Sequence, residues 1–182
     1  MKKTLFVIAA FVFSASTLFA QSGGPSDAQI AAIVVAANQV DIDAGKLAES
    51  KSTSKEVKDF AQRMVTDHTG VNKSATELVT KLKVKPEENP TSTSLKKGGE
   101  DTRKRLQGLK GAEFDKAYID NEIAYHQAVI DTVNKVLIPN ALNAELKSAL
   151  SGAVPLFEGH LEHAKSVQAA LEGKTPAQQT TH

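Results

Sequence analysis

The stretch FAQRMVTDHTGVN, residues 60–72, carries the pattern that decides the fold. Its apolar side chains recur at spacings of three and four residues, which is the period of a helix with one buried face. His68 lies on that same face, where a leucine is the commoner choice. Because a buried polar ring costs stability unless it has a partner, the rest of the chain is expected to supply one.

The same period recurs upstream and continues downstream of this stretch. A first helix is expected to begin at the capping-box pattern S-x-x-Q of residues 26–29 and to end near residue 50. The second, which contains residues 60–72, is expected to begin at the T-x-x-E pattern of residues 53–56. Lysines and prolines in residues 81–90 end it, because proline cannot continue a helix and lysines suit its negative end.

Two further helices are expected after a polar connection. Residues 83–111 hold two prolines, a Thr/Ser cluster and a glycine pair, with a short helix around residues 100–109. A third long helix is expected over residues 112–137, ended by Pro139. A fourth is expected over residues 142–171, which Pro155 should kink or break in its first half.

These segments predict an all-α protein. No segment alternates with the period of a strand, and four long amphipathic helices favour a ferritin-like four-helix bundle with a long connection between helices 2 and 3. That connection could run the length of the bundle or loop at one end, and the sequence leaves both topologies open.

The N-terminus, MKKTLFVIAAFVFSASTLFAQ, has the layout of a secretory signal peptide: two lysines, an uncharged apolar run and a small residue at Ala20. The apolar run is shorter than the ~20 residues of a membrane span, which argues against the alternative of a retained anchor. We therefore expect residues 1–20 to be a signal peptide, 21–26 a short leader, 27–172 the bundle and 173–182 a disordered tail. The protein would be exported, either periplasmic or secreted.

Charge and cysteine content restrict the partners. Cleavage after residue 20 would lower Lys plus Arg from 22 to 20 against 21 acids, so the mature chain would carry a net charge of −1. A nearly neutral surface offers no field for phosphates, which argues against a nucleic-acid partner. The chain has no cysteine, so an exported form is held together without disulfides, by its core or by something bound in it.

Each of the four expected helices has one titratable residue in its inward row: Asp41, His68, His126 and His160. Each unpaired buried polar group would cost ~1–3 kcal/mol, so the four must pair with one another or bind an ion. Their heights along the helices differ by up to ~10 Å, so we do not expect all four to contact one ion. A metal site and an ion-free network of histidines and carboxylates both fit this pattern.

Other groups near these four positions could complete a site. Glu122 lies one helical turn before His126 and is a candidate ligand or partner. In a second tier, Met64 lies one turn before His68, His163 follows His160 in an H-x-x-H pattern, and Asp67 adjoins His68 at an angle that suits an orienting or surface role. Nitrogen ligands without thiolate fit zinc, copper or iron.

Motifs for catalysis are not found in the sequence. There is no nucleophile elbow, phosphate-binding glycine loop or catalytic-triad pattern. The E-x-x-H pairs of di-iron bundles are also missing, because Glu122 and His126 are four residues apart and Glu158 precedes His160 by two. A ferroxidase centre is therefore not expected. A redox or hydrolytic enzyme at the same cluster stays a third alternative, with no motif to support it.

Three stretches carry a resemblance to a known family: DIDAGKLAESKSTSKEVKDFAQRMVTDHTGVN, EFDKAYIDNEIAYHQAVID and VPLFEGHLEHAKSV. The chain resembles the domain-of-unknown-function 4142 family over about residues 27–171, most specifically in R-M-V-x-D-H at residues 63–68. The resemblance implies an exported bacterial protein with a ferritin-like bundle and special roles for His68, His126 and His160. The family usually has a glutamate where this chain has Asp41, and often an acid where it has Tyr125.

Two hypotheses of different classes follow. In the first, the protein is an exported metal-binding bundle, with the three histidines as ligands and Asp41 or Glu122 as an oxygen ligand or partner. In the second, it is a structural or interaction protein of the envelope, whose polar core fixes the register of the helices and binds no ion.

Overall fold

The computed structural model describes residues 23–173. The expected signal peptide, with its cleavage site, and the expected tail beyond residue 173 lie outside this range. Among the described residues, no helix combines the length and the apolar character that crossing a membrane requires.

The described residues form helices and no strand, which confirms the all-α prediction. Short turns join the helices, and η1 is a π-helical segment. The elements are α1 (Asp27–Lys51), α2 (Lys55–Lys81), α3 (Pro90–Gly108), α4 (Gly111–Thr132), η1 (Val133–Leu137), α5 (Ile138–Asn140) and α6 (Ala144–Gly173).

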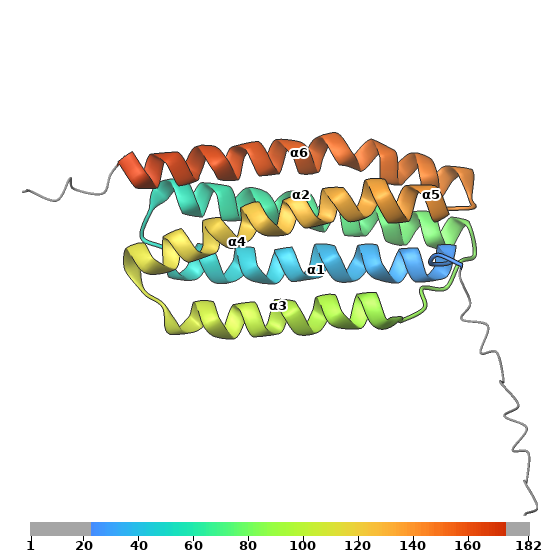
Figure 1. Cartoon of the computed structure of the whole chain (residues 1–182), viewed down its shortest axis with the longest axis horizontal. Coiled ribbons are helices and arrows are strands. Elements are labelled where there is room, and N and C mark those ends of the chain that lie inside the picture. Colours follow the sequence, from blue (N-terminus) through green and yellow to red (C-terminus); the bar gives the residue numbers. More distant parts are fainter. Residues whose placement is uncertain (1–22, 174–182) are drawn as a thin grey trace, which may run out of the picture.

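The connection between the second and third long helices runs the full length of the bundle (Figure 1). Helices α1 and α2 are antiparallel, α3 returns along the outside of α1, and α4 then runs in the same direction as α2. Helix α6 closes the bundle antiparallel to α4 and also packs on α2. The order down, up, crossover, up, down is the topology of ferritin-like bundles, so the alternative of a loop at one end is wrong.

Helix α3 is longer than the short helix expected near residues 100–109. It starts at Pro90, where the Asn89 side chain accepts hydrogen bonds from the backbone N–H groups of Thr91 and Ser92. Only two of its residues, Ser92 and Leu106, are buried. Leu95 and Leu106 are the only large apolar residues in this helix, so its sequence resembles a polar connection, which explains the missed length.

Two helix starts can be compared with their expected capping patterns. The Ser26–Gln29 capping box of α1 is present, with both reciprocal hydrogen bonds formed. Helix α2 is capped by Ser54, whose hydroxyl accepts from the backbone N–H of Val57, so the expected cap at Thr53 is wrong by one residue. A serine three residues before an N–H donor is an equally good cap, and sequence alone did not separate the two.

The two prolines behave differently from expectation. Pro139 does not end the third long helix: α4 continues through the wide π turn of η1 into α5, which contains this proline. A π turn is one of the ways in which a helix accommodates a missing hydrogen bond. Pro155 lies inside the continuous helix α6, so the expected break is wrong.

The core has two parts on either side of a polar layer, which contains Asp41, His68, Glu122, His126 and His160. We call the first the packed half; it contains Ala44, Ala48, Val57, Phe60, Ala61, Met64, Leu106, Phe114, Tyr118, Ile119, Ala164 and Val167. We call the second the hollow half; it contains Ile30, Ile33, Ile130, Val133, Leu137, Ala141, Leu146, Leu150, Phe157 and Leu161. Along α1, α2 and α4, the residues of the polar layer fall between these two sets.

Candidate metal centre

The four inward titratable residues expected from the sequence are all buried. Relative exposure is 1% for Asp41, 4% for His68, 1% for His126 and 0% for His160. Glu122, one turn before His126 on α4, is equally buried at 1%. Side chains from four different helices are therefore buried in one layer. Each of them destabilises the fold unless it has a hydrogen-bond or ionic partner, because burial removes its contacts with water.

The three histidine rings form a triangle. Their centroids are 5.6 Å apart for His68 and His126, 5.1 Å for His68 and His160, and 5.3 Å for His126 and His160. One potential ligand atom from each of the three lies within 4.8 Å of the other two. A second group of the same kind contains Asp41, Glu122 and His126. The groups share His126, and neither contains all four inward residues, as expected from their heights.

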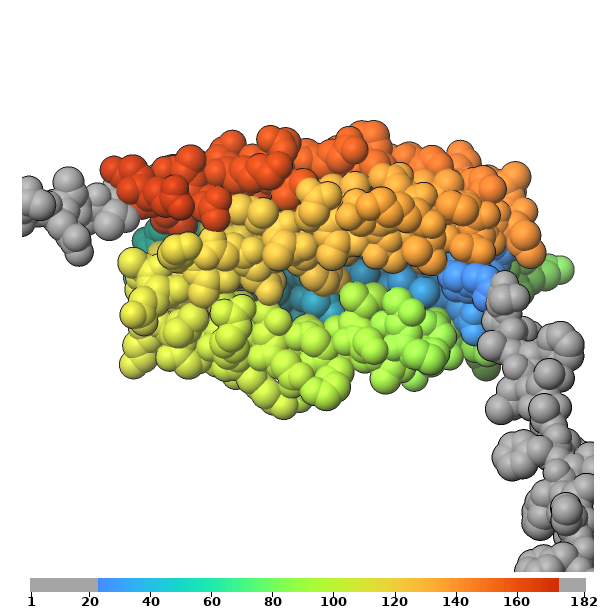
Figure 2. Space-filling view, viewed as in Figure 1, coloured from blue at the N-terminus to red at the C-terminus, as the bar shows by residue number. Residues whose placement is uncertain are grey.

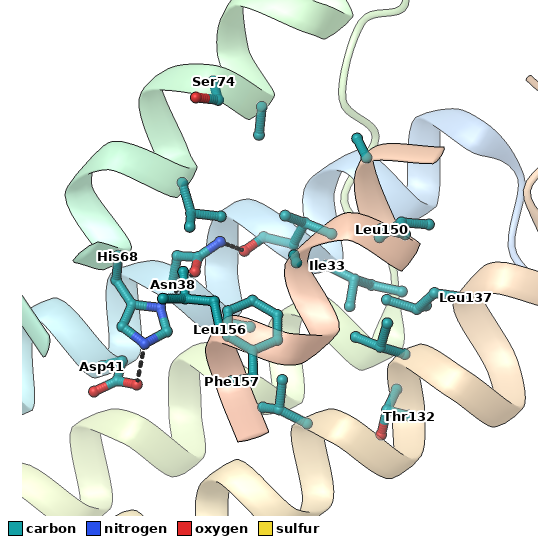
Figure 3. A pocket seen from close by; sticks show the side chains of 18 of the residues that line it. Ile33, Asn38, Asp41, His68, Ser74, Thr132, Leu137, Leu150, Leu156 and Phe157 are labelled. Atoms are coloured by element: carbon teal, nitrogen blue, oxygen red, sulfur yellow. Dashed lines mark hydrogen bonds and ion pairs between the residues drawn. The ribbon is translucent and has the colours of Figure 1, made fainter. Parts of the chain in front are cut away.

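His68 is held in one tautomer by Asn38. The Asn38 amide nitrogen donates to the Val34 carbonyl at 2.9 Å, which turns the amide oxygen toward His68 Nδ1 at 2.6 Å. An amide oxygen only accepts, so Nδ1 carries the proton. The other nitrogen, Nε2, points at Asp41, 2.9 Å from Oδ2 (Figure 3). Phe157 stacks on the ring with an interplanar angle of 2°.

His126 is oriented by its own helix. Its Nδ1 lies 3.0 Å from the backbone carbonyl of Glu122, which can only accept, so Nδ1 donates. Nε2 makes no hydrogen bond with any described residue and lies 3.4 Å from Asp41 Oδ2. Burial, with a smaller contribution from His68, lowers the pKa of His126, so this ring is neutral at pH 7.

His160 is oriented by a carboxylate on another helix. Its Nε2 donates to Asp67 Oδ2 at 2.9 Å, and Arg63, one turn earlier on α2, donates to the same oxygen at 3.3 Å. Burial lowers the pKa of His160 to about 4, although the Asp67 hydrogen bond opposes the shift. The free nitrogen, Nδ1, is buried and unpaired among the described residues.

These contacts explain the spacing of the R-M-V-x-D-H stretch. Arg63 and Asp67 are four residues apart and so share one helix face. The hydrogen bond from His160 and then that from Arg63 outweigh burial and lower the pKa of Asp67, so its carboxylate is ionised. Asp67 then orients His160, while His68, the next residue, faces the interior. One stretch of α2 thus provides a ring of the triangle and the partner that orients another ring.

Asp41 and Glu122 hold different protonation states. Burial alone would raise the pKa of Asp41, but His68, with help from His126, outweighs it, and the net shift is downward. Burial, together with the neighbouring charge of Asp41, raises the pKa of Glu122 well above its usual value. Asp41 is therefore the ionised member of the pair, and Glu122 is a neutral acid that can donate to it.

Met64 and His163, two candidates of the second tier, contact other groups. Met64 is fully buried in the packed half, near Phe60. His163 is half-buried on α6, where its Nδ1 lies 3.3 Å from Arg63 and its ring meets Phe60 edge-on. Sequence reasoning missed Asn38 altogether. The available signal was its position three residues before Asp41 in the inward row of α1.

The arrangement is chemically suited to a cation. Each ring donates one N–H to an oxygen that only accepts, which leaves a nitrogen lone pair on each and places two of them beside the ionised carboxylate of Asp41. Histidines that ligate metals nearly always donate their second N–H in this way, to a carboxylate, a carbonyl or water. The buried His, Asp and Glu groups could thus hold a metal ion.

Comparison with known proteins gives one match. The chain matches the family described as a domain of unknown function (DUF4142) over residues 14–167, which is most of its length and includes all the residues of the candidate centre. No curated protein and no solved structure matches the chain.

Proposed function

We propose that this chain, which belongs to the DUF4142 family of unknown function, binds a transition-metal ion in its buried polar layer. His68, His126 and His160 would be the nitrogen ligands. Asp41 would be an oxygen ligand or the charge that balances the ion, and Glu122 a hydrogen-bond donor to Asp41 or a further oxygen ligand.

The contact between His68 and Asp41 carries this proposal. Because Asn38 fixes the His68 proton on Nδ1, the Nε2 lone pair of a neutral ring would face a carboxylate oxygen at 2.9 Å. Two electron-rich atoms at this distance repel each other unless a cation or a second proton lies between or beside them. The Nε2 lone pair of His126 also faces this oxygen, Asp41 Oδ2, at 3.4 Å.

The donor set restricts the kind of ion. Three imidazole nitrogens and one carboxylate, without thiolate, suit zinc, copper or iron, whereas calcium and magnesium prefer oxygen ligands. With neutral His126 and His160 and an ionised Asp41, the buried groups provide negative charge to offset a divalent cation. The function we propose is binding, storage or handling of such an ion.

The alternative is an ion-free network, and one observation favours it. A doubly protonated His68 would form a normal ion pair with Asp41 at 2.9 Å, and Asp41 has a lowered pKa because of this neighbour. The polar layer would then fix the register of four helices without a ligand, as buried polar groups do in some helical assemblies.

Elemental analysis of the purified tag-free protein, followed by thermal unfolding with and without chelator, tests the two functions. The metal proposal predicts a near-stoichiometric ion whose removal lowers the unfolding midpoint by several degrees. His68→Ala, His126→Ala and His160→Ala should each abolish this dependence on metal. His163→Ala is the matched control, because it removes an imidazole one turn from His160 that faces Arg63 instead of the centre.

The same experiment can refute the metal proposal. If the protein contains no metal, does not respond to added zinc, copper or iron, and loses equal stability in the three variants with and without chelator, the ion-free network is correct. If the three alanine variants fail to fold, His→Gln changes at the same positions replace them. Glutamine keeps a polar group of similar size, and these variants should still fail to bind metal.

We also propose that the protein works outside the cytoplasm, in the envelope. The support is the N-terminal stretch of residues 1–20, with its lysines, uncharged apolar run and terminal alanine. N-terminal sequencing of the protein recovered from the cell envelope should begin at Gln21. A mature chain that begins at Met1 would refute cleavage.

A further inference from the structure

The hollow half of the bundle contains a cavity of about 660 Å³. It is lined by residues of α1, α2, α3, α4, η1 and α6, and ends at the polar layer, where Asp41, His68 and His126 form part of its wall. Its volume lies within the range of ~300–1,000 Å³ that is usual for ligand pockets. Figure 3 shows the apolar side chains of this wall around Phe157 and Leu150.

The cavity is elongated along the bundle axis. On α1 its lining runs from Ala31 to Asp41. On α2, beyond Thr66 and Asp67 at its polar edge, it runs from His68 to Val79. Ten or eleven residues at a rise of 1.5 Å each give a length of roughly 15–17 Å on both helices. An extended chain advances by about 1.2 Å per bond, as the polypeptide backbone does, so this length accommodates a hydrocarbon chain of about 12–14 carbons.

Charge and polarity are confined to the ends and the rim. Away from the polar layer, Ser74 and Thr91 are exposed at the rim, and Thr132 donates its hydroxyl to the Ala128 carbonyl. Near the polar layer, the Asn38 amide donates to the Val34 carbonyl and accepts from His68, and the Tyr125 hydroxyl donates to the Ala37 carbonyl. The middle of the cavity therefore offers no free hydrogen-bonding group to a polar ligand, and apolar surface is what it can bury.

Small side chains create the space. Alanine occurs at position after position where the wall of a packed bundle would carry leucine or phenylalanine. The buried or half-buried alanines of the lining are Ala31, Ala37, Ala75 and Ala153, whereas Ala128 and Ala149 are exposed at its rim.

The cavity also has an entrance from the surface. Helix α4 packs mainly on α6, and α3 mainly on α1, so a hollow remains between α3 and α4 with α1 at its base (Figure 2). Val34 on α1, Leu95 on α3 and Val129 on α4 line the cavity and are only half-buried. A ligand can thus enter lengthwise without unfolding a helix.

We propose that this cavity binds the unbranched acyl chain of a single-chain amphiphile. The chain lies along the bundle axis between the polar layer and the α5–α6 end, and the head group stays at the entrance between α3 and α4. This proposal does not depend on a metal ion, because the lining that contacts the chain is apolar and lies beyond the histidine triangle.

Calorimetric titration with straight-chain alcohols and carboxylates of 8 to 16 carbons, below their micelle concentrations, tests the proposal on the mature protein. We expect one site, with affinity rising about fourfold per methylene up to about 12–14 carbons and then levelling, because further carbons find no apolar wall. The heat-capacity change should be negative. Binding should be the same with and without chelator, so a failed metal proposal would leave this result unchanged.

Three variants from three helices, Ala37→Leu, Ala75→Leu and Ala153→Leu, fill the cavity from different sides. Each should weaken binding of dodecanol at least tenfold. Ala117→Leu, at a half-buried position beside the packed half, is the matched control and should change it less than twofold. No saturable binding by the wild type, or equal affinity in all four variants, would overturn the proposal. The chain-length series on the wild type decides the matter even if a variant fails to fold.

Discussion

The two halves of the bundle interior differ in how their side chains fill the space between the helices. In the packed half, Phe60, Phe114 and Tyr118 fill the space between helices, with ring centroids 6.1–6.3 Å apart along the Phe60–Tyr118–Phe114 chain of contacts. In the hollow half, aliphatic residues and Phe157 line a cavity of about 660 Å³. The close-packed part of the core and the part with space for a ligand therefore lie at different places along the bundle axis, with the polar layer between them.

The position of the polar layer follows from this division. On α2, Met64 belongs to the packed half and Val71 contacts the hollow half, with His68 between them. On α4, Glu122 and His126 lie between Ile119 and Ile130 in the same way. The polar layer therefore lies between close packing on one side and the cavity on the other. His68 and His126 border the cavity, which suits a site that a ligand must reach.

The largest expected effect comes from truncating one large core residue in each half. Phe60→Ala should destabilise the protein by about 3–5 kcal/mol, because a close-packed site cannot collapse around the void. Leu150→Ala in the hollow half should cost about 2 kcal/mol, the low end for leucine, because its neighbours already border a cavity. Denaturant unfolding of both variants measures the difference, and equal losses would contradict the division into halves.

A smaller effect is expected where α2 supports the polar layer. Asp67→Asn removes the carboxylate that orients His160, so the affinity for the bound metal should fall by about 10–100-fold. Asp59→Asn, at an exposed position on the same helix that pairs with Lys55, is the control and should leave the affinity unchanged. Competition with a chelator of known affinity gives both values; unchanged binding in Asp67→Asn would remove His160 from the ligand set.

The polar layer should also make the metal-free protein sensitive to acid. The pKa of His160 falls from its ordinary value of about 6.5 to about 4 on folding, and that of His126 is also lowered. Between these pH values the unfolded chain binds more protons than the folded one, so stability is lost as the pH falls. Glu122 opposes this trend, because its raised pKa favours the folded state at low pH.

Thermal unfolding of the chelator-treated protein between pH 7 and pH 4.5 measures this dependence. The midpoint should fall with pH because two histidines oppose one carboxyl group. Glu122→Gln removes the opposing group and should steepen the fall. A midpoint that stays independent of pH in Glu122→Gln would mean that neither ring is buried neutral.

The smallest effect concerns the helix start at the packed end. Ser54→Ala should cost about 1 kcal/mol, because the Val57 N–H loses its acceptor, whereas Thr53→Ala should cost almost nothing. Denaturant unfolding distinguishes the two. The reverse order would restore Thr53 as the cap that the sequence pattern predicted.

Much of the fold could be predicted from the sequence because helical periodicity is local. The inward rows of α1, α2, α4 and α6 follow from the spacing of their own apolar residues, and so do the buried positions of Asp41, His68, His126 and His160. Prolines were less informative, since the effect of Pro139 depends on whether the preceding turn can widen into a π turn.

The amino-acid sequence by itself determined which side chains face inward, because a helix of fixed period assigns each residue to a face before any other helix is present. Only the tertiary structure decided which of these side chains meet. The Asp67–His160 and Asn38–His68 contacts join residues 93 and 30 positions apart, and the crossover of α3 and the cavity depend on how whole helices are placed. Local periodicity contains no information about the axial offset between helices, and that offset brings three rings and a carboxylate into one layer.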